Sequence, residues 1–292
     1  NTYSTPHIYS KKTTDDIYKK SMSDVLNPMN VKIRESRDSD EHPESLPIIL
    51  ALDVTGSMSP VLDAMAKNGL PTLMEEIYKR KPVADPQLMF MGIGDVTCDR
   101  SPLQVSQFES DIRIAEQLTQ LHLEHGGGGN NSESYILAWY FAAMRTSCDS
   151  WEKRSKKGYL FTFGDENITP ELTSDQIKSV LGYSTECDYT PERLFEIASN
   201  TYEVYHLMVT EGDHYQRHGD SVKKSWLKVI GERAIPLTDH TKMGEVVISI
   251  IEHNEGKKKD DIINSWSGDT SIAVKNAIKD LKVKESDGII VL

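Results

Sequence analysis

Short runs of consecutive apolar residues recur along this chain, and a segment of helix length follows most of them. The runs lie at residues 46–52, 87–93, 159–163 and 202–209, with a shorter one at 234–237. A continuous apolar run of this length is typical of a strand that is buried on both faces of a parallel sheet. We therefore predict a single-domain α/β fold: a Rossmann-like, open, mostly parallel sheet with helices on both faces.

The segments between these runs carry apolar residues at helical spacing. In residues 61–80, for example, Leu62, Met65, Leu73 and Ile77 fall on one side of a helix. The predicted helices cover residues 61–80, 111–121, 132–146, 174–181, 191–200, 221–230 and 242–253.

Both ends of the chain depart from this alternation. Residues 1–45 are polar and charged, and we predict an N-terminal arm that is partly extended or disordered. Residues 46–255 are predicted to form the α/β domain. Residues 256–292 are predicted to add one amphipathic helix and an extended tail at 288–292, which pack on the domain.

Charge and cysteine content restrict the partners and the compartment. The formal net charge is −12, which argues against nucleic acid or an anionic membrane as the main partner, because both bind basic surfaces. The three cysteines, Cys98, Cys148 and Cys187, have neither disulfide-framework nor zinc-site spacing. Free thiols indicate a reducing compartment, so we expect a cytoplasmic location.

The first apolar run ends in oxygen-bearing side chains. Asp53 is followed at alternate positions by Thr55 and Ser57, with Gly56 between them. This spacing lets three side chains turn toward one point, and Gly56 permits a close approach of the backbone. The competing interpretation is a helix N-cap at Ser57 or at the serine before Pro60.

Two later loops carry similar groups. Asp165 follows the third long run, and four glycines at 126–129 lead into Asn131, Ser132 and Glu133. Ligands of open parallel sheets bind outside the carboxyl ends of the strands, where these loops are expected to meet. Carboxylate, hydroxyl and amide oxygens suit Mg²⁺, with Mn²⁺ or Ca²⁺ as alternatives. Taken singly, Asp165 also suits a helix cap and the glycines suit a turn.

The stretch "IILALDVTGSMS" resembles the first metal-binding loop of von Willebrand factor type A (vWA) domains, whose pattern is Asp-x-Ser-x-Ser. The resemblance implies a Rossmann-like fold with a metal-ion-dependent adhesion site (MIDAS). The first loop would supply Asp53, Thr55 and Ser57, and "YLFTFGDEN" would supply Asp165 from a later loop. The threonine that the family carries on its second loop falls here on Asn131.

Either Asn131 or its neighbour Ser132 would then be the second-loop ligand. Three further acidic residues are predicted to lie at the rim of the site: Asp95, Glu133 and Glu166.

Such a site favours recognition over turnover. A cation with an open position binds an Asp or Glu side chain of a partner, so we expect a metal-dependent protein-binding module. The resemblance implies an intracellular multiprotein complex, with an AAA-type ATPase system as a candidate partner. The alternatives are an Mg²⁺-dependent hydrolase that uses Glu133 or Glu166 as its base, and an assembly protein with a non-functional metal site. No catalytic residue is predicted, because the acid–base position of a haloacid-dehalogenase-type phosphatase is Thr55 here.

Overall fold

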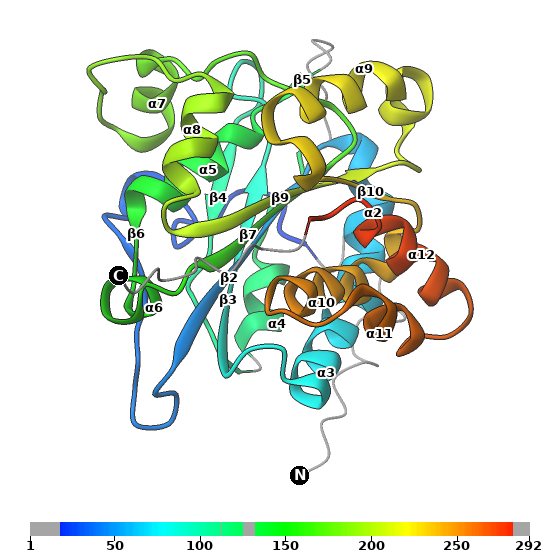
Figure 1. Cartoon of the computed structure of the whole chain (residues 1–292). Coiled ribbons are helices and arrows are strands. Elements are labelled where there is room, and N and C mark those ends of the chain that lie inside the picture. Colours follow the sequence, from blue (N-terminus) through cyan, green and yellow to red (C-terminus); the bar gives the residue numbers. More distant parts are fainter. Residues whose placement is uncertain (1–17, 112, 125–131, 283–292) are drawn as a thin grey trace, which may run out of the picture.

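The structure is a computed structural model that describes residues 18–111, 113–124 and 132–282. Its centre is a six-stranded sheet in the order β10-β9-β7-β2-β3-β4, in which β4 alone is antiparallel to its neighbour (Figure 1). The strands are β2 (Ser45–Asp53), β3 (Asp85–Ile93), β4 (Leu103–Val105), β7 (Gly158–Gly164), β9 (Tyr202–Val209) and β10 (Ala234–Leu237). The prediction of a single-domain α/β fold with a mostly parallel sheet is confirmed.

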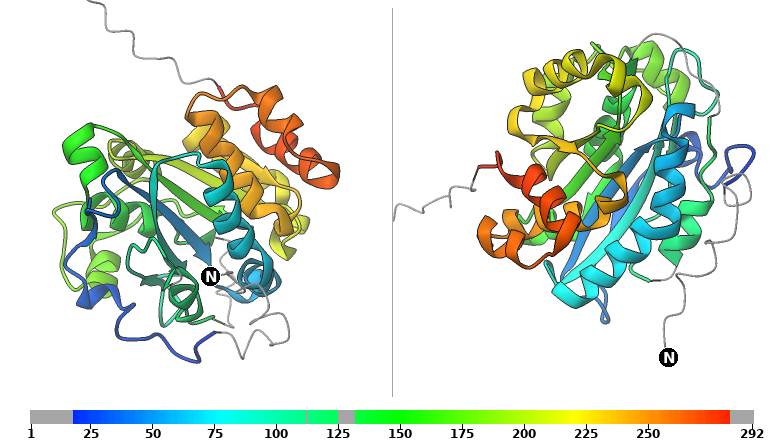
Figure 2. Two further views of the ribbon diagram at one scale, coloured as in Figure 1. Left: turned by 90° about the horizontal axis from the view of Figure 1, so that it is seen from below. Right: turned by 90° about the vertical axis from the view of Figure 1, so that its right-hand side faces the viewer.

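Helices cover both faces of this sheet (Figure 2). One layer contains α2 (Ser59–Ala64), α3 (Leu70–Arg80), α4 (Arg113–Thr119), α10 (Met243–Asn254), α11 (Lys259–Asn264) and α12 (Gly268–Ile278). The other contains α5 (Tyr135–Arg145), α7 (Ser174–Leu181), α8 (Pro191–Ala198) and α9 (Asp213–Ile230). No helix among the described residues is both long and apolar enough to cross a membrane.

The burial of the central strand β2 on both faces explains why its sequence is apolar without alternation. Ile48 and Leu50 pack into the layer that contains α3 and α10, whereas Ile49 and Ala51 pack into the layer that contains α5 and α9. Successive side chains of a strand point to opposite faces, so both faces of β2 must be apolar when both are covered.

The described part of the N-terminal arm lies against the domain. Tyr18 is buried, and its hydroxyl donates to the carbonyl of Leu62 in α2 at 2.7 Å. Further along, β1 (Arg34–Ser36) pairs in parallel with β6 (Thr146–Cys148), which follows α5. The arm thereby adds a second, two-stranded sheet to the molecule.

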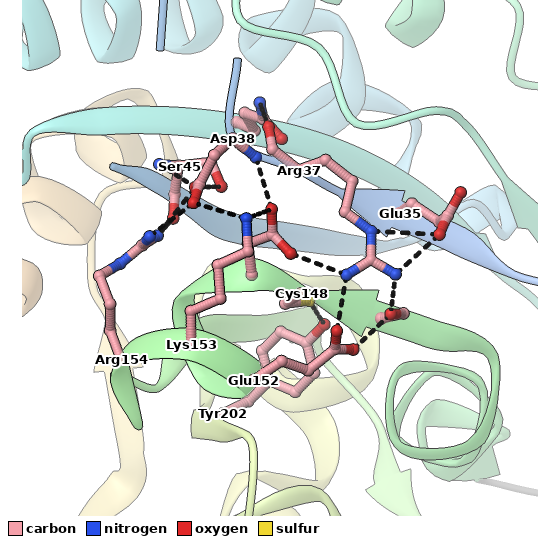
Figure 3. Close-up of polar contacts among 12 residues, drawn as sticks. Glu35, Arg37, Asp38, Ser45, Cys148, Glu152, Lys153, Arg154 and Tyr202 are labelled. Atoms are coloured by element: carbon pink, nitrogen blue, oxygen red, sulfur yellow. Dashed lines mark hydrogen bonds and ion pairs between the residues drawn. The ribbon is translucent and has the colours of Figure 1, made fainter. Parts of the chain in front are cut away.

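A polar network holds the arm to α6 (Asp149–Arg154) just after β1 (Figure 3). Arg37 pairs with Asp149 at 2.9 Å, and Asp38 accepts two hydrogen bonds from Arg154 at 2.7 and 3.0 Å. The hydroxyl of Ser45, the first residue of β2, also donates to Asp38 at 2.7 Å. The network therefore connects the arm, α6 and the start of the central strand.

Two predicted helices are interrupted. The segment 61–80 is divided into α2 and α3 by a π-helical turn, Met65–Gly69. Pro71 has no N–H to donate to the carbonyl four residues earlier, so a regular helix cannot pass this point. The single C-terminal helix is instead divided into α11 and α12, and Gly268, the first residue of α12, has a left-handed φ of 56°. The predicted tail at 288–292 lies outside the described residues.

Several short elements complete the fold. They are the strands β5 (Ser132–Glu133) and β8 (Asn167–Ile168), and the 3-10 helices at Pro28–Asn30, Gly56–Met58, Gly231–Arg233 and His240–Lys242.

Candidate metal-binding site

Three acidic residues lie at the carboxyl ends of neighbouring strands. Asp53 is the last residue of β2, Asp165 follows β7, and Asp95 comes two residues after β3. Because β7, β2 and β3 are adjacent and parallel, their carboxyl ends lie side by side at one end of the sheet. All three carboxylates are at most 1% exposed, so they lie within the protein rather than on its surface.

The first loop folds back on its own aspartate. Oδ1 of Asp53 accepts hydrogen bonds from the backbone N–H of Thr55 at 2.9 Å and from its hydroxyl at 2.5 Å. Thr55 precedes the 3-10 turn Gly56–Met58, but its side chain makes no capping hydrogen bond to that turn. The hydroxyl of Thr55 therefore faces the carboxylate rather than a helix end. The side chain of Ser57 lies outside what the structure describes.

The second loop carries Ser132 and Glu133, and the third loop follows β7 and carries Asp165 and Glu166. The two loops are joined by backbone pairing. Ser132 and Glu133 form β5 rather than the predicted start of a helix, and they pair in parallel with Asn167 and Ile168 of β8. The pairing replaces the first helical turn, so α5 begins at Tyr135. Asn131 lies outside the described residues, and its role as a ligand stays a prediction.

Glu133 is buried close to the other carboxyl groups of the candidate site. It is 1% exposed, and its Oε2 has no hydrogen-bond partner within the part of the chain that the structure describes. Burial, followed by the nearby charges of Asp53 and Glu166, raises the pKa of Glu133 to about 11. A buried carboxyl oxygen without a partner is costly, and a bound cation or water would relieve that cost.

The third loop is anchored by α9. The backbone N–H of His214 donates to Oδ2 of Asp165 at 3.0 Å, and the indole N–H of Trp226 donates to the carbonyl of Glu166 at 3.0 Å. Burial and then the charge of Asp53 raise the pKa of Glu166 to about 7. Nδ1 of His214 lies 3.9 Å from a carboxylate oxygen of Glu166.

The carboxyl groups at this end of the strands gather negative charge. Burial, and then the charge of Asp165, raises the pKa of Asp53 to about 7. Among the described residues, no lysine or arginine forms an ion pair with Asp53, Glu133 or Glu166. Ionised carboxylates that are buried close together repel one another and resist ionisation, and a cation between them would reverse both effects.

The predicted rim residue Asp95 has close partners in its own turn. Its Oδ1 accepts from the backbone N–H and the hydroxyl of Thr97 at 2.8 and 2.7 Å. This repeats the contact pattern of Asp53 with Thr55, also two residues apart. Cys98 is exposed, but its thiol lies 3.3 Å from the other oxygen of Asp95. Partial desolvation, followed by this hydrogen bond, raises the pKa of the thiol to about 12.

No group of three or more His, Cys, Asp or Glu side chains is placed to hold one metal ion, as far as the described residues extend. The predicted ligand set is of another kind, because Asp53 and Asp165 are its only carboxylates and hydroxyl or amide oxygens complete it. The structure brings Asp53 and Thr55 into contact and places Asp165 near enough to affect the pKa of Asp53. It places Ser132 in β5, beside the third loop.

Tyr135 contacts the candidate site and was not among the predicted site residues. Its ring packs against His206 and Trp226, and its hydroxyl donates to Oδ2 of Asp53 at 2.9 Å. Its position near the start of the helix that was predicted after the four glycines was the available signal, but Tyr135 and Asp53 are 82 positions apart.

Comparisons with known proteins give structural similarity alone. No protein-family model matches the chain, and no curated protein matches it in sequence. The pilus adhesin SpaC from Lactobacillus rhamnosus GG, in its open conformation, is 14% identical over 79% of this chain and 31% of its own, with a TM-score of 0.49. This chain thus spans about a third of SpaC.

Two smaller structures are also similar. A von Willebrand factor type A protein from Catenulispora acidiphila is 13% identical over 74% of this chain and 44% of its own, with a TM-score of 0.40. BatB, a conserved hypothetical protein from Bacteroides thetaiotaomicron, is 12% identical over 56% of this chain and 66% of its own, with a TM-score of 0.33. The strand order and the helical layers establish the α/β fold independently of these similarities.

Proposed function

We propose that this chain is a vWA-like protein-binding module that holds one divalent cation and recognises an Asp or Glu side chain of a partner through it. The observation that carries the proposal is a group of carboxyl groups at the carboxyl end of the strands, of which those of Asp53 and Glu133 are buried and that of Glu166 is half-buried. Asp53, Glu133 and Glu166 all have raised pKa values there, and none has a lysine or arginine partner among the described residues.

The donor set fits a hard cation. Mg²⁺ prefers oxygen ligands and commonly retains waters, so Mg²⁺ is the proposed ion, with Mn²⁺ or Ca²⁺ as alternatives. The proposed ligands are Asp53, Thr55, Ser57, Asp165 and one side-chain oxygen from Asn131 or Ser132. The unpartnered Oε2 of Glu133 supports this assignment, because it marks a buried site that is short of positive charge.

Partner recognition follows from the number of ligands. An octahedral cation takes six ligands, and the protein would supply five side-chain oxygens. The sixth position would face outward, where a carboxylate from a partner can fill it. Binding would then require both the metal and an acidic residue. An intracellular complex with an AAA-type ATPase system is the kind of partner that the first-loop resemblance suggests, and the resemblance alone supports it.

The competing class is a metal-dependent hydrolase. Its supporting observation is Glu166, whose pKa of about 7 suits a general base that works near neutral pH. The distinguishing test is turnover of a phosphate ester such as p-nitrophenyl phosphate. Turnover that disappears in Asp53→Asn would favour the hydrolase, whereas the binding module predicts none.

The first experiment measures the cation directly. Thermal melts with EDTA, Mg²⁺ or Mn²⁺ should show a higher melting temperature with metal, because a ligand at 100 times its Kd stabilises the native state by about 2.7 kcal/mol. Asp53→Ala should lose this shift. Asp85→Asn is the control, because Asp85 is the first residue of β3 and lies at the opposite, amino end of the strands. An unchanged shift in Asp53→Ala, or no shift in the wild type, would contradict the proposal.

The second experiment addresses the partner. Tagged wild-type protein, Asp53→Ala and Asp85→Asn would be used to capture proteins in Mg²⁺ or in EDTA. A partner that is retained in Mg²⁺ by the wild type and by Asp85→Asn, but is lost in EDTA and with Asp53→Ala, is expected. The Asp and Glu residues of that partner would then be replaced one at a time, and one of these replacements should abolish capture.

A further inference from the structure

We propose that Tyr135 is the positioning residue of the candidate metal site, where its hydroxyl holds the Asp53 carboxylate and ties the first loop to the third. This inference rests on the proposed function and goes beyond it, because it assigns the orientation of the site to a residue that is not itself a metal ligand. It makes the start of α5 part of the binding machinery.

The hydroxyl of Tyr135 joins two loops through one atom. It donates to Oδ2 of Asp53 at 2.9 Å, and the backbone N–H of Glu166 donates to it at 3.4 Å. A phenol has one proton to donate and lone pairs to accept with, so both interactions can form together. The end of β2 and the turn after β7 are thereby linked through a side chain of α5.

The ring of Tyr135 is held firmly enough to position a carboxylate. Tyr135 is fully buried, and its ring packs edge-on against His206 at 5.0 Å and Trp226 at 5.3 Å between centroids. Trp226 also donates to the carbonyl of Glu166, the residue whose N–H contacts the phenol. The tyrosine and the third loop are therefore braced by the same side chain of α9.

The end of β7 leaves room for this hydroxyl. A Cβ atom at Gly164 would overlap the phenol oxygen and the carbon that carries it. Gly164 has no left-handed backbone angle that would otherwise require glycine. The small residue at this position therefore serves the close approach of Tyr135.

A neutral donor suits this position for an electrostatic reason. Thr55 occupies Oδ1 of Asp53 and Tyr135 occupies Oδ2, so the plane of the carboxylate is fixed before any ligand arrives. A lysine or arginine here would fix it equally well, but its charge would compete with a cation. The phenol orients the carboxylate and leaves its negative charge available, as groups behind metal ligands commonly do.

The test compares two tyrosines of the same helix. Tyr135→Phe removes the hydroxyl and keeps the ring, and Tyr140→Phe is the matched control, because Tyr140 is buried and its hydroxyl contacts that of Tyr183 at 3.0 Å, away from Asp53. Titration calorimetry with Mn²⁺ should show affinity about 10–100-fold weaker for Tyr135→Phe and unchanged for Tyr140→Phe. Equal affinity of Tyr135→Phe and the wild type would overturn the inference while leaving the proposed function intact.

A second measurement needs no metal. Hydrogen exchange in EDTA should be faster at the amides of Thr55 and Glu166 in Tyr135→Phe than in Tyr140→Phe, because the link between the two loops is lost. A wild type that binds no Mn²⁺ would overturn the proposed function, and exchange would then decide whether Tyr135 positions these loops. Unchanged exchange together with unchanged affinity would reduce Tyr135 to a packing residue.

Discussion

The backbone N–H of His214 donates to Oδ2 of Asp165, so a residue at the end of β7 caps a helix that begins 48 positions later in the sequence. A carboxylate at a helix N-terminus is stabilised by the unpaired N–H groups of the first turn and by the helix dipole. The two interpretations of Asp165, helix cap and metal ligand, are thus compatible. One oxygen serves α9, and the carboxylate as a whole stays beside Asp53.

Gly212→Ala should disturb Asp165 without straining the backbone. Gly212 has ordinary extended angles, but a Cβ there would overlap the carboxylate of Asp165. We expect a loss of about 1–3 kcal/mol in the free energy of unfolding, as overpacking typically causes, together with a smaller Mg²⁺-induced melting shift. Gly219→Ala, within α9, should keep the full shift, because its neighbour is the movable ring of Tyr215. A full shift in Gly212→Ala would argue against Asp165 as a ligand.

Thr55 allows a test of the hydroxyl alone. Thr55→Ser keeps the donor to Asp53 and should preserve the Mg²⁺-induced shift in melting temperature. Thr55→Val keeps the shape but removes the hydroxyl that donates to Oδ1 at 2.5 Å, and it should abolish most of that shift. If the valine variant responds to Mg²⁺ as the serine variant does, Thr55 is not a ligand.

Stability without metal should fall as pH rises. The pKa values of Asp53 and Glu166 are raised to about 7, and that of Glu133 to about 11, from about 4 in the unfolded chain. The native state therefore binds more protons than the unfolded state above pH 4, and the free energy of unfolding contributed by these groups decreases from about pH 4 upward through pH 7. Mg²⁺ binds the ionised carboxylates, so its stabilising effect should increase from pH 5 to pH 8.

Glu133→Gln identifies the source of this pH dependence. It removes a carboxyl group that is still protonated in the native state at pH 8, so the loss of stability between pH 5 and pH 8 in EDTA should become shallower. The buried His206 has a lowered pKa and acts in the opposite direction, but it is present in both proteins and cancels in the difference. Urea unfolding at four pH values measures the slope, and an equal or steeper slope in the variant contradicts the prediction.

The sheet was predictable because burial on both faces leaves a plain mark in the sequence. Residues 202–209 and 234–237 were predicted as strands with the bounds that β9 and β10 have in the structure. The short strands β1, β6, β5 and β8 were not predicted. They are two or three residues long and mostly polar, and their partners lie far away in sequence, so no local periodicity marks them.

The candidate site was predictable where its residues follow one another. The alternation of Asp53, Thr55 and Ser57 is local, and the contact between the first two follows from it. The contact of Asp53 with Tyr135 depends on how α5 packs across the sheet, and the capping of α9 by Asp165 depends on the loop after β9. Neither contact has a signature at fixed spacing, so the structure was needed to find them.

Asp38→Asn should loosen the arm from the domain. The carboxylate accepts two hydrogen bonds from Arg154 and one from the hydroxyl of Ser45, and these contacts hold its pKa well below the usual value. Because its side chain is only 17% exposed, we expect a loss of about 1–3 kcal/mol in the free energy of unfolding at pH 7. Asp111→Asn is the control: Asp111 is exposed and pairs within its own turn with Arg113, so the change should be below about 0.5 kcal/mol.

The pH dependence and the location of the effect of Asp38→Asn can both be checked. A lowered pKa means that the stabilisation by Asp38 is present above about pH 4 and is lost as pH falls below it, so wild type and Asp38→Asn should converge in acid. Hydrogen exchange should be faster in β1 and β6 of the variant, because the network that adjoins their pairing is broken, while exchange at Thr55 stays unchanged. The Mg²⁺-induced melting shift should also persist, because this network lies at the start of β2 and the candidate site lies at its end. Loss of that shift in Asp38→Asn would mean that the arm contributes to the metal site, although Asp38 contacts Arg154 and Ser45 at the other end of β2.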